Sequence, residues 1–242
     1  MPWFFTNEEL EDDSCLIIGE DSRHIEKSLR MRIGEELTLV SPEQVESLCE
    51  ITEFTQEGVR VCVKAQKPCE NEPKVNVTLY QSLTKGDKMD FIVQKAVELG
   101  VHRIVPVLSA RCISRPEEKQ MKKKIERWQK IASGAASQSC RGKIPQVEDM
   151  LAFPKALEDA KDKKAIIFYE GGGEKLSSLV STDTGGDIGI FIGSEGGFEP
   201  LEVEQAKARG VVPATLGKRI LRAETAPLAA LSSIMLLTGN FD

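Results

Sequence analysis

The stretch that decides the fold is residues 190–198, with the sequence IFIGSEGGF. Its apolar start is typical of a buried strand, and its glycines allow a sharp turn and close approach of the backbone to a ligand. A short helix is expected over 199–209, closed by Gly210. Because ligands in parallel α/β sheets bind beyond the carboxyl ends of strands, the turn at 193–197 is a candidate ligand loop. A tight turn without a ligand is the alternative interpretation.

Strands and helices alternate around this turn. The pattern predicts strands over 75–80, 103–108, 165–169 and 188–192, and helices over 88–99, 199–209 and 225–237. A further helix is expected to start at Ser114, where Ser114 and Glu117 have the spacing of a capping box. Alternation of this kind predicts an α/β domain, residues 74–242, with a parallel sheet covered on both faces.

The first 70 residues have a different pattern of short alternating segments. Strands are expected over 15–18, 37–40, 49–54 and 59–63. Gly34 and Gly58 stand where turns are needed. Close-spaced strands predict a small β-barrel over residues 1–70, followed by a polar, proline-containing linker at 67–73.

Composition excludes several classes of protein. The chain has 242 residues, a net charge of −6, two histidines and six cysteines, none of them in a C-x-x-C pair. No apolar run approaches the roughly 20 residues that span a bilayer, and the amino terminus lacks the pattern of a secretory signal. We therefore expect a cytoplasmic protein with reduced thiols, no metal site and no membrane association. The negative charge disfavours a globally basic nucleic-acid binder but allows a local basic face.

Known ligand and catalytic motifs do not fit the turn. It is neither G-x-G-x-x-G, nor a Walker A loop, nor a G-x-S-x-G elbow. Both histidines, His24 and His102, lie far upstream, which disfavours a serine hydrolase. An early G-x-G-x-x-G with a following acid is also absent, which disfavours a nicotinamide-dependent oxidoreductase.

A second informative segment is residues 215–226, with the sequence TLGKRILRAETA. It places three basic residues and one acid in a loop between a short strand and an apolar helix that Thr225 could cap. Arginines in such loops bind phosphate, so the segment indicates an anionic partner. The alternative interpretation is a solvated loop that binds no ligand.

These two segments together resemble the signature of the ribosomal RNA small subunit methyltransferase E family, which belongs to the SPOUT class. Residues 24–34, 94–101 and 127–141 resemble further family segments in the same order. The chain departs from the family pattern at five positions, which are Trp3, Gly134, Ser137, Ser194 and Ala223.

The resemblance implies a PUA-like β-barrel over 1–70 and a SPOUT α/β domain over 74–242 with a carboxyl-terminal trefoil knot. It also implies a homodimer that methylates N3 of a specific uridine in 16S rRNA, within the assembled small subunit, using S-adenosyl-L-methionine. The implied cofactor contacts are Leu83, Tyr169, Glu170, Ile192, Gly193, Glu195, Gly196, Gly197, Leu216, Gly217, Ile220, Leu221, Arg222, Thr225 and Ala226.

The same resemblance suggests catalytic roles. Arg222 would stabilise negative charge on the base, and Glu195 or Glu224 would take the proton, unless Glu224 instead orients Arg222. RNA contacts are expected from the amino-terminal cations, which are Arg23, Lys27, Arg30 and Arg32. A second cationic candidate is the helix carrying residues 122–130, and a solvated charged face is the alternative for both.

Two other functions stay open on the sequence. One is a SPOUT methyltransferase that acts on transfer RNA or on a ribose 2′-hydroxyl. The other is an RNA-binding module without catalytic activity.

Overall fold

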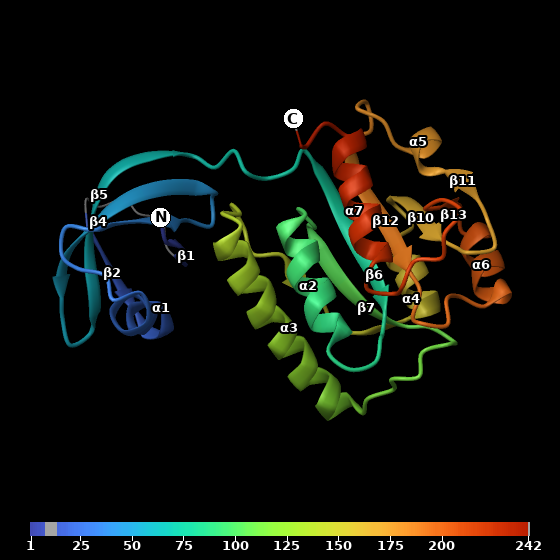
Figure 1. Cartoon of the computed structure of the whole chain (residues 1–242), viewed down its shortest axis with the longest axis horizontal. Coiled ribbons are helices and arrows are strands. Elements are labelled where there is room, and N and C mark those ends of the chain that lie inside the picture. The colour runs from blue at the N-terminus through green and yellow to red at the C-terminus, as the bar shows by residue number, and fades with distance from the viewer. Residues whose placement is uncertain (8–13, 242) are drawn as a thin grey trace. The chain divides into compact units, whose positions relative to one another are not determined.

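The structure is a computed structural model that describes residues 1–7 and 14–241. It divides into two compact units, shown in Figure 1, one of residues 1–72 with 136–144 and one of 73–135 with 145–242. The segment 136–144 therefore belongs to the first unit, although the sequence pattern alone groups it with the second. Among the described residues, none of the helices is both long and apolar enough to cross a bilayer.

The first unit is built on a five-stranded sheet with the order β1-β3-β4-β5-β2. Its strands are β1 (Trp3–Phe5), β2 (Ser14–Ile18), β3 (Glu36–Val40), β4 (Val45–Phe54) and β5 (Gly58–Pro68). Gly58 is required where β5 pairs with β2, because an added Cβ would lie 2.1 Å from the carbonyl oxygen of Ile17. β5 continues through Pro68 because it pairs with the start of β4, so the expected linker at 67–73 is partly strand.

Two short helices that the sequence pattern did not predict connect β2 to β3. They are α1 (Gly19–Arg23) and the π-helix η1 (His24–Leu29). Ile25 in η1 is fully buried in the core of this unit together with Leu37 and Ile51. Arg30 ends the π-helix in the left-handed conformation, with φ at 53°.

The second unit contains an eight-stranded sheet in which every pairing is parallel, as expected. The order is β11-β13-β10-β12-β6-β7-β8, and β9 also pairs with β7. The strands are β6 (Val75–Ser82), β7 (Arg103–Leu108), β8 (Gln146–Val147), β9 (Leu151–Ala152), β10 (Lys164–Phe168), β11 (Glu174–Lys175), β12 (Gly186–Ile192) and β13 (Val212–Thr215).

Six helices accompany this sheet. They are α2 (Lys88–Glu98), α3 (Glu118–Gln138), α4 (Phe153–Asp159), α5 (Leu176–Leu179), α6 (Pro200–Lys207) and α7 (Ala226–Leu237). α2 and α7 lie side by side, and α7 contacts β6 and β12 (Figure 1). α4 and α6 pack against Tyr80 and Phe191, whose rings stack 4.4 Å apart.

One expected helix start and one expected cap are wrong. α3 begins at Glu118 instead of Ser114, because Pro116 disfavours the helical conformation at Arg115, and Arg115 donates side-chain hydrogen bonds to the carbonyls of Cys112 and Ala110 in the preceding loop. α7 begins at Ala226 with Thr225 at its N-cap position, as the expected helix over 225–237 requires, but the Thr225 side chain makes no capping bond. The capping box of the second unit lies at α6, between Glu199 and Glu202.

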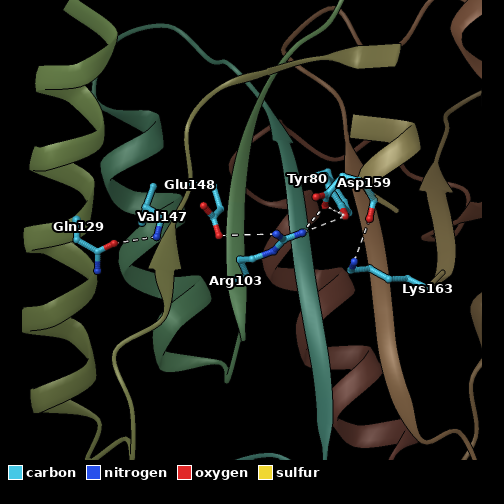
Figure 2. A network of polar contacts seen from close by, with 7 residues as sticks. All are labelled: Tyr80, Arg103, Gln129, Val147, Glu148, Asp159 and Lys163. Carbon is cyan, nitrogen blue, oxygen red and sulfur yellow. Dashed lines mark hydrogen bonds and ion pairs between the residues drawn. The ribbon is translucent and has the colours of Figure 1, made fainter. Parts of the chain in front are cut away.

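A polar network joins β6, β7 and α4, as Figure 2 shows. The guanidinium of Arg103 pairs with the carboxylate of Asp159 and lies 3.7 Å from that of Glu148. The hydroxyl of Tyr80 donates to Asp159, and Lys163 donates to the Asp159 carbonyl at 3.0 Å. The network fixes α4 against the sheet whose strand ends carry the candidate site.

Candidate functional site

The site lies where parallel strands end together. β12 pairs with β6 so that Ile192 faces Gln81, and β12 pairs with β10 so that Phe191 faces Ile167. The loops that leave these strands therefore start at the same edge of the sheet. The carboxamide of Gln81 donates to the Gly193 carbonyl at 3.4 Å. This bond anchors the first residue of the turn at 193–197, here called the glycine turn.

The glycines of this turn are required by close contacts. A Cβ on Gly193 would lie 2.9 Å from the Cα of Gly197, so the two ends of the turn can approach only without side chains. Gly197 has φ at +66°, and a Cβ there would lie 2.5 Å from the carboxylate of Glu170. The turn thus presents bare backbone to the space beside Glu170.

The basic loop, residues 216–226, faces the glycine turn across a cavity of about 370 Å³. That volume lies within the range of roughly 300–1,000 Å³ found for small-molecule sites. The cavity is lined by Lys88, Phe168, Tyr169, Glu170, Ile192, Gly193, Ser194, Glu195, Gly196, Gly197, Leu216, Gly217, Lys218, Arg219, Ile220, Leu221, Arg222, Ala223 and Ala226.

This cavity brings together nearly all the residues that were expected to contact the cofactor or to take part in catalysis. Leu83, Thr225 and Glu224 do not line it. Leu83 is buried and donates its backbone N–H to the Val107 carbonyl at 2.9 Å. Ile220 lines the cavity and is 86% exposed, so it is a candidate contact for a ligand.

Lys88 is a lining residue that the sequence analysis missed. Its ammonium lies 2.9 Å from the carboxylate of Glu224 and 3.6 Å from that of Glu195. The hydrogen bond with Glu224 is the largest cause of a raised Lys88 pKa. The signal that could have found Lys88 is its position just after strand β6, at the edge where parallel sheets bind ligands.

Both carboxylates have lowered pKa values. Burial alone would raise the pKa of Glu195, but the backbone N–H of Lys85, which donates to it at 3.0 Å, and the ammonium of Lys88 outweigh that effect. The pKa of Glu224 is lowered mainly by its hydrogen bond with Lys88, with a smaller effect of Arg222. Both groups are therefore ionised at neutral pH.

Arg111 is the second residue that the sequence analysis missed. It lies in the loop after β7 and donates to the Gly196 carbonyl at 2.8 Å, while its guanidinium lies 4.0 Å from the Glu170 carboxylate. The Ser194 hydroxyl donates to the Arg111 carbonyl at 3.2 Å. Nothing in the local sequence indicates these contacts, because they join segments more than 80 positions apart.

The expected RNA-binding cations lie on the surface of the first unit. Arg23 ends α1, Lys27 lies in η1, and Arg30 and Arg32 follow, all with exposed side chains. On α3, Arg127 forms an ion pair with Asp90, so part of that second cationic cluster is neutralised. Among residues 1–7 and 14–241, no group of three or more metal-ligand side chains is found.

The parallel sheet, the glycine turn and the basic loop define an RNA methyltransferase domain, and the model of the RNA methyltransferase domain family matches residues 70–235. Ribosomal RNA small subunit methyltransferase E of Bacillus subtilis is 37% identical over 95% of this chain and 93% of its own length. The chain belongs to the ribosomal RNA small subunit methyltransferase E family.

Solved structures agree with this assignment. The enzyme of that name from Neisseria gonorrhoeae, bound to S-adenosyl methionine, superposes with a TM-score of 0.89 at 34% identity, over 98% of both chains. A Legionella pneumophila structure described as a methyltransferase with bound cofactor has a TM-score of 0.88 at 28% identity, over 97% of this chain and 96% of its own.

Proposed function

We propose that this chain methylates N3 of a specific uridine in 16S rRNA, using S-adenosyl-L-methionine bound in the cavity between the glycine turn and the basic loop. The observation that carries the proposal is the pairing of a backbone-lined turn with an arginine-bearing loop across one cavity. Family membership and the cofactor named in the N. gonorrhoeae structure support it.

The residues of the cavity fit this cofactor. Bare backbone at Gly193, Gly196 and Gly197 leaves room for a flat nucleoside, and Glu170 offers a carboxylate to its hydroxyl groups. Leu216, Ile220 and Leu221 offer apolar surface and backbone groups from the opposite wall. When bound, the cofactor supplies an activated methyl group on a positively charged sulfur. The protein therefore has mainly to align the two reactants and exclude water.

The base must lose the proton of N3 as the new N–C bond forms. In our proposal Arg222, an exposed lining residue, stabilises the negative charge that develops on the uracil ring. Glu195 lines the cavity and Glu224 does not, so Glu195 is the better-placed proton acceptor. The lowered pKa keeps Glu195 ionised and able to accept the proton, while Arg222 reduces the cost of the negative charge on the ring.

RNA binding is assigned to the first unit, which we propose to be a PUA-like barrel. Its exposed cations would contact phosphates, as the charged surface of α1 and η1 suggests. The assembled small subunit is the expected substrate, which implies a cytoplasmic location.

We also propose that the second unit carries a trefoil knot and forms homodimers. The chain leaves β13, which lies beyond β10, and returns through the basic loop to pack α7 against β6 and β12. The adjacent helices α2 and α7 expose Phe91 and Leu236, at 45% and 61%, as apolar surface for a second copy.

An in vitro transfer assay tests the proposed activity. The purified chain is incubated with methyl-labelled S-adenosylmethionine and, in parallel, with small subunits, free 16S rRNA or transfer RNA. The proposal expects label in the small subunits, released on digestion as N3-methyluridine. Label in transfer RNA or on a ribose 2′-oxygen would support the competing SPOUT activity, and absence of label would favour a binding module.

A further inference from the structure

One cation lies between the two loops of the proposed site. Lys88, the first residue of α2, places its ammonium 2.9 Å from Glu224 of the basic loop and 3.6 Å from Glu195 of the glycine turn. The three side chains are 25–31% exposed, so the cluster is partly shielded from solvent. A single ammonium has three donors and can satisfy two carboxylates at once.

The cluster also includes the backbone of the loop after β6. The Glu195 carboxylate, which faces Lys88, also accepts a hydrogen bond from the backbone N–H of Lys85 at 3.0 Å. Three segments that are distant in sequence therefore meet at one point: the β6–α2 loop, the glycine turn and the basic loop.

Glu224 lies inside the turn that carries Arg222. The Arg222 carbonyl accepts the N–H groups of Thr225 and Ala226, both at 2.9 Å, so residues 222–226 form a compact turn at the start of α7. Any contact that fixes Glu224 in space also fixes the backbone from which the Arg222 side chain extends.

We propose that Lys88 is a positioning residue of this methyltransferase site, which joins the glycine turn to the basic loop through Glu195 and Glu224 and thereby sets the location of Arg222. The proposal rests on the proposed function and deepens it, because it assigns the alignment of the two cavity walls to one ammonium group. Lys88 acts through the two carboxylates and needs no contact with the RNA.

Two measurable consequences distinguish a positioning role of Lys88 from a direct contact with RNA. Cofactor affinity depends on Lys88 in the absence of RNA, because both cavity walls depend on it. The effects of removing Lys88 and removing the charge of Glu224 overlap, because the two groups form one interaction. A lysine that only contacted RNA phosphate would leave cofactor affinity unchanged.

The test is calorimetric titration of the full chain with S-adenosylmethionine, for the unaltered protein, K88M, K88R, E224Q and the double variant K88M/E224Q. K85M is the matched control, since the Lys85 side chain is exposed in the same loop and only its backbone contacts Glu195. We expect K88M to weaken binding roughly five- to tenfold, the size expected for a partly exposed ion-pair cluster. K88R should recover most of the affinity, and K85M should match the unaltered chain.

The double variant should bind no more than about twofold worse than K88M, which is the signature of coupled residues. Turnover on small subunits at saturating cofactor should also fall in K88M and recover in K88R. Unchanged affinity and turnover in K88M, or fully additive effects in the double variant, would overturn the proposal. If K88M does not fold, E224Q and K88R give the answer: unaltered binding and turnover in E224Q contradict the role.

Titration of the unaltered chain tests the proposed function, and its comparison with K88M tests the role of Lys88. If the unaltered chain binds no S-adenosylmethionine, the proposed function is wrong. If the unaltered chain and K88M bind it equally well, the proposed function stands and only the role of Lys88 is wrong.

Discussion

The guanidinium of Arg111 donates a hydrogen bond of 2.8 Å to the carbonyl oxygen of Gly196. This contact ties the loop after β7 to the apex of the glycine turn. The methylene groups of the same arginine lie against Gly196, since a Cβ built on that glycine would be 3.1 Å from the Arg111 Cβ. Arg111 therefore supports the cavity wall from behind without lining the cavity.

Replacement of Arg111 by alanine should loosen this wall. We expect R111A to weaken S-adenosylmethionine binding by about 1 kcal/mol, or roughly fivefold, the usual value for a lost hydrogen bond from a charged donor at a partly exposed position. Calorimetry measures the effect, and R209A, at an exposed arginine after α6, is the control. Equal affinities for R111A and the unaltered chain would show that the glycine turn keeps its shape without Arg111.

Gly197 should tolerate a side chain poorly. In G197A the new Cβ meets the Glu170 carboxylate at 2.5 Å and the residue must keep φ near +66°, so Glu170 has to leave its place beside the turn and cofactor binding should weaken. G210A is a matched control, because Gly210 has φ at +80° but open space around its Cβ. Both variants should lose a similar amount of stability, about 1 kcal/mol, and only G197A should bind the cofactor more weakly. Binding by G197A at the unaltered affinity would remove this turn from the cofactor site.

The network around Asp159 should lower the stability of the folded state at both acidic and alkaline pH. Burial alone would raise the pKa of Asp159, but hydrogen bonds from Tyr80 and Arg103 outweigh it and lower that pKa. The ionised Asp159 therefore stabilises the folded state above the carboxyl's unfolded pKa of about 4. This stabilisation is lost as pH falls through the lower pKa of the folded state. Burial, followed by the hydrogen bond to Asp159, raises the pKa of Tyr80, so stability also falls once pH exceeds about 10, where the unfolded tyrosine ionises.

Urea unfolding of D159A checks this expectation (Figure 2). At pH 7 the variant should be destabilised by roughly 2 kcal/mol, because it leaves Arg103 and the Tyr80 hydroxyl without their shared acceptor. The difference from the unaltered chain should shrink as pH is lowered below 4. A difference that stays constant from pH 7 to pH 3 would contradict the ionic part of the argument.

Gly134 is an exposed glycine within α3 at one of the positions where the chain departs from its family pattern. A Cβ there would meet no atom within 4 Å. We expect G134A to raise the free energy of unfolding by about 0.5–1 kcal/mol, since alanine loses less backbone entropy in a helix. Thermal unfolding measures it, and a lowered melting temperature would indicate that this position needs glycine for a reason outside the helix.

RNA affinity should depend on salt through the first unit. K27A removes an exposed cation of η1, and R30N removes the next one while keeping a residue that accepts the left-handed conformation. Each change should lower the slope of log affinity against log salt by about one unit if the cation contacts a phosphate. Filter binding to small subunits between 50 and 200 mM salt would measure the slopes, and unchanged slopes would place the RNA elsewhere.

The sequence predicted the parts of the fold that depend on local periodicity. The parallel sheet follows from the strand at 186–192 and its neighbours, whose apolar runs are continuous because both faces are covered. The glycine turn was found because its glycines are needed by the backbone itself. The π-helix at 24–29 and the helix at 153–159 were missed, since their short segments lack a clear helical period and are stabilised by buried contacts of Ile25 and Phe153.

The candidate site was predicted only where one segment carries its own signal. Arg222 and the turn at 193–197 stand in recognisable stretches, but Lys88 and Arg111 act through partners more than 80 positions away. Such pairings are decided by strand order, which periodicity does not reveal. Lys88 would have been found by asking which polar residues follow every parallel strand.

The decisive measurement is nucleoside mass spectrometry of 16S rRNA from cells that lack this gene. We predict that one N3-methyluridine disappears, and that it returns when the unaltered chain is supplied but not when R222A is supplied at the same level. An unchanged set of methylated nucleosides, or loss of a 2′-O-methyl group instead, would contradict the proposed function.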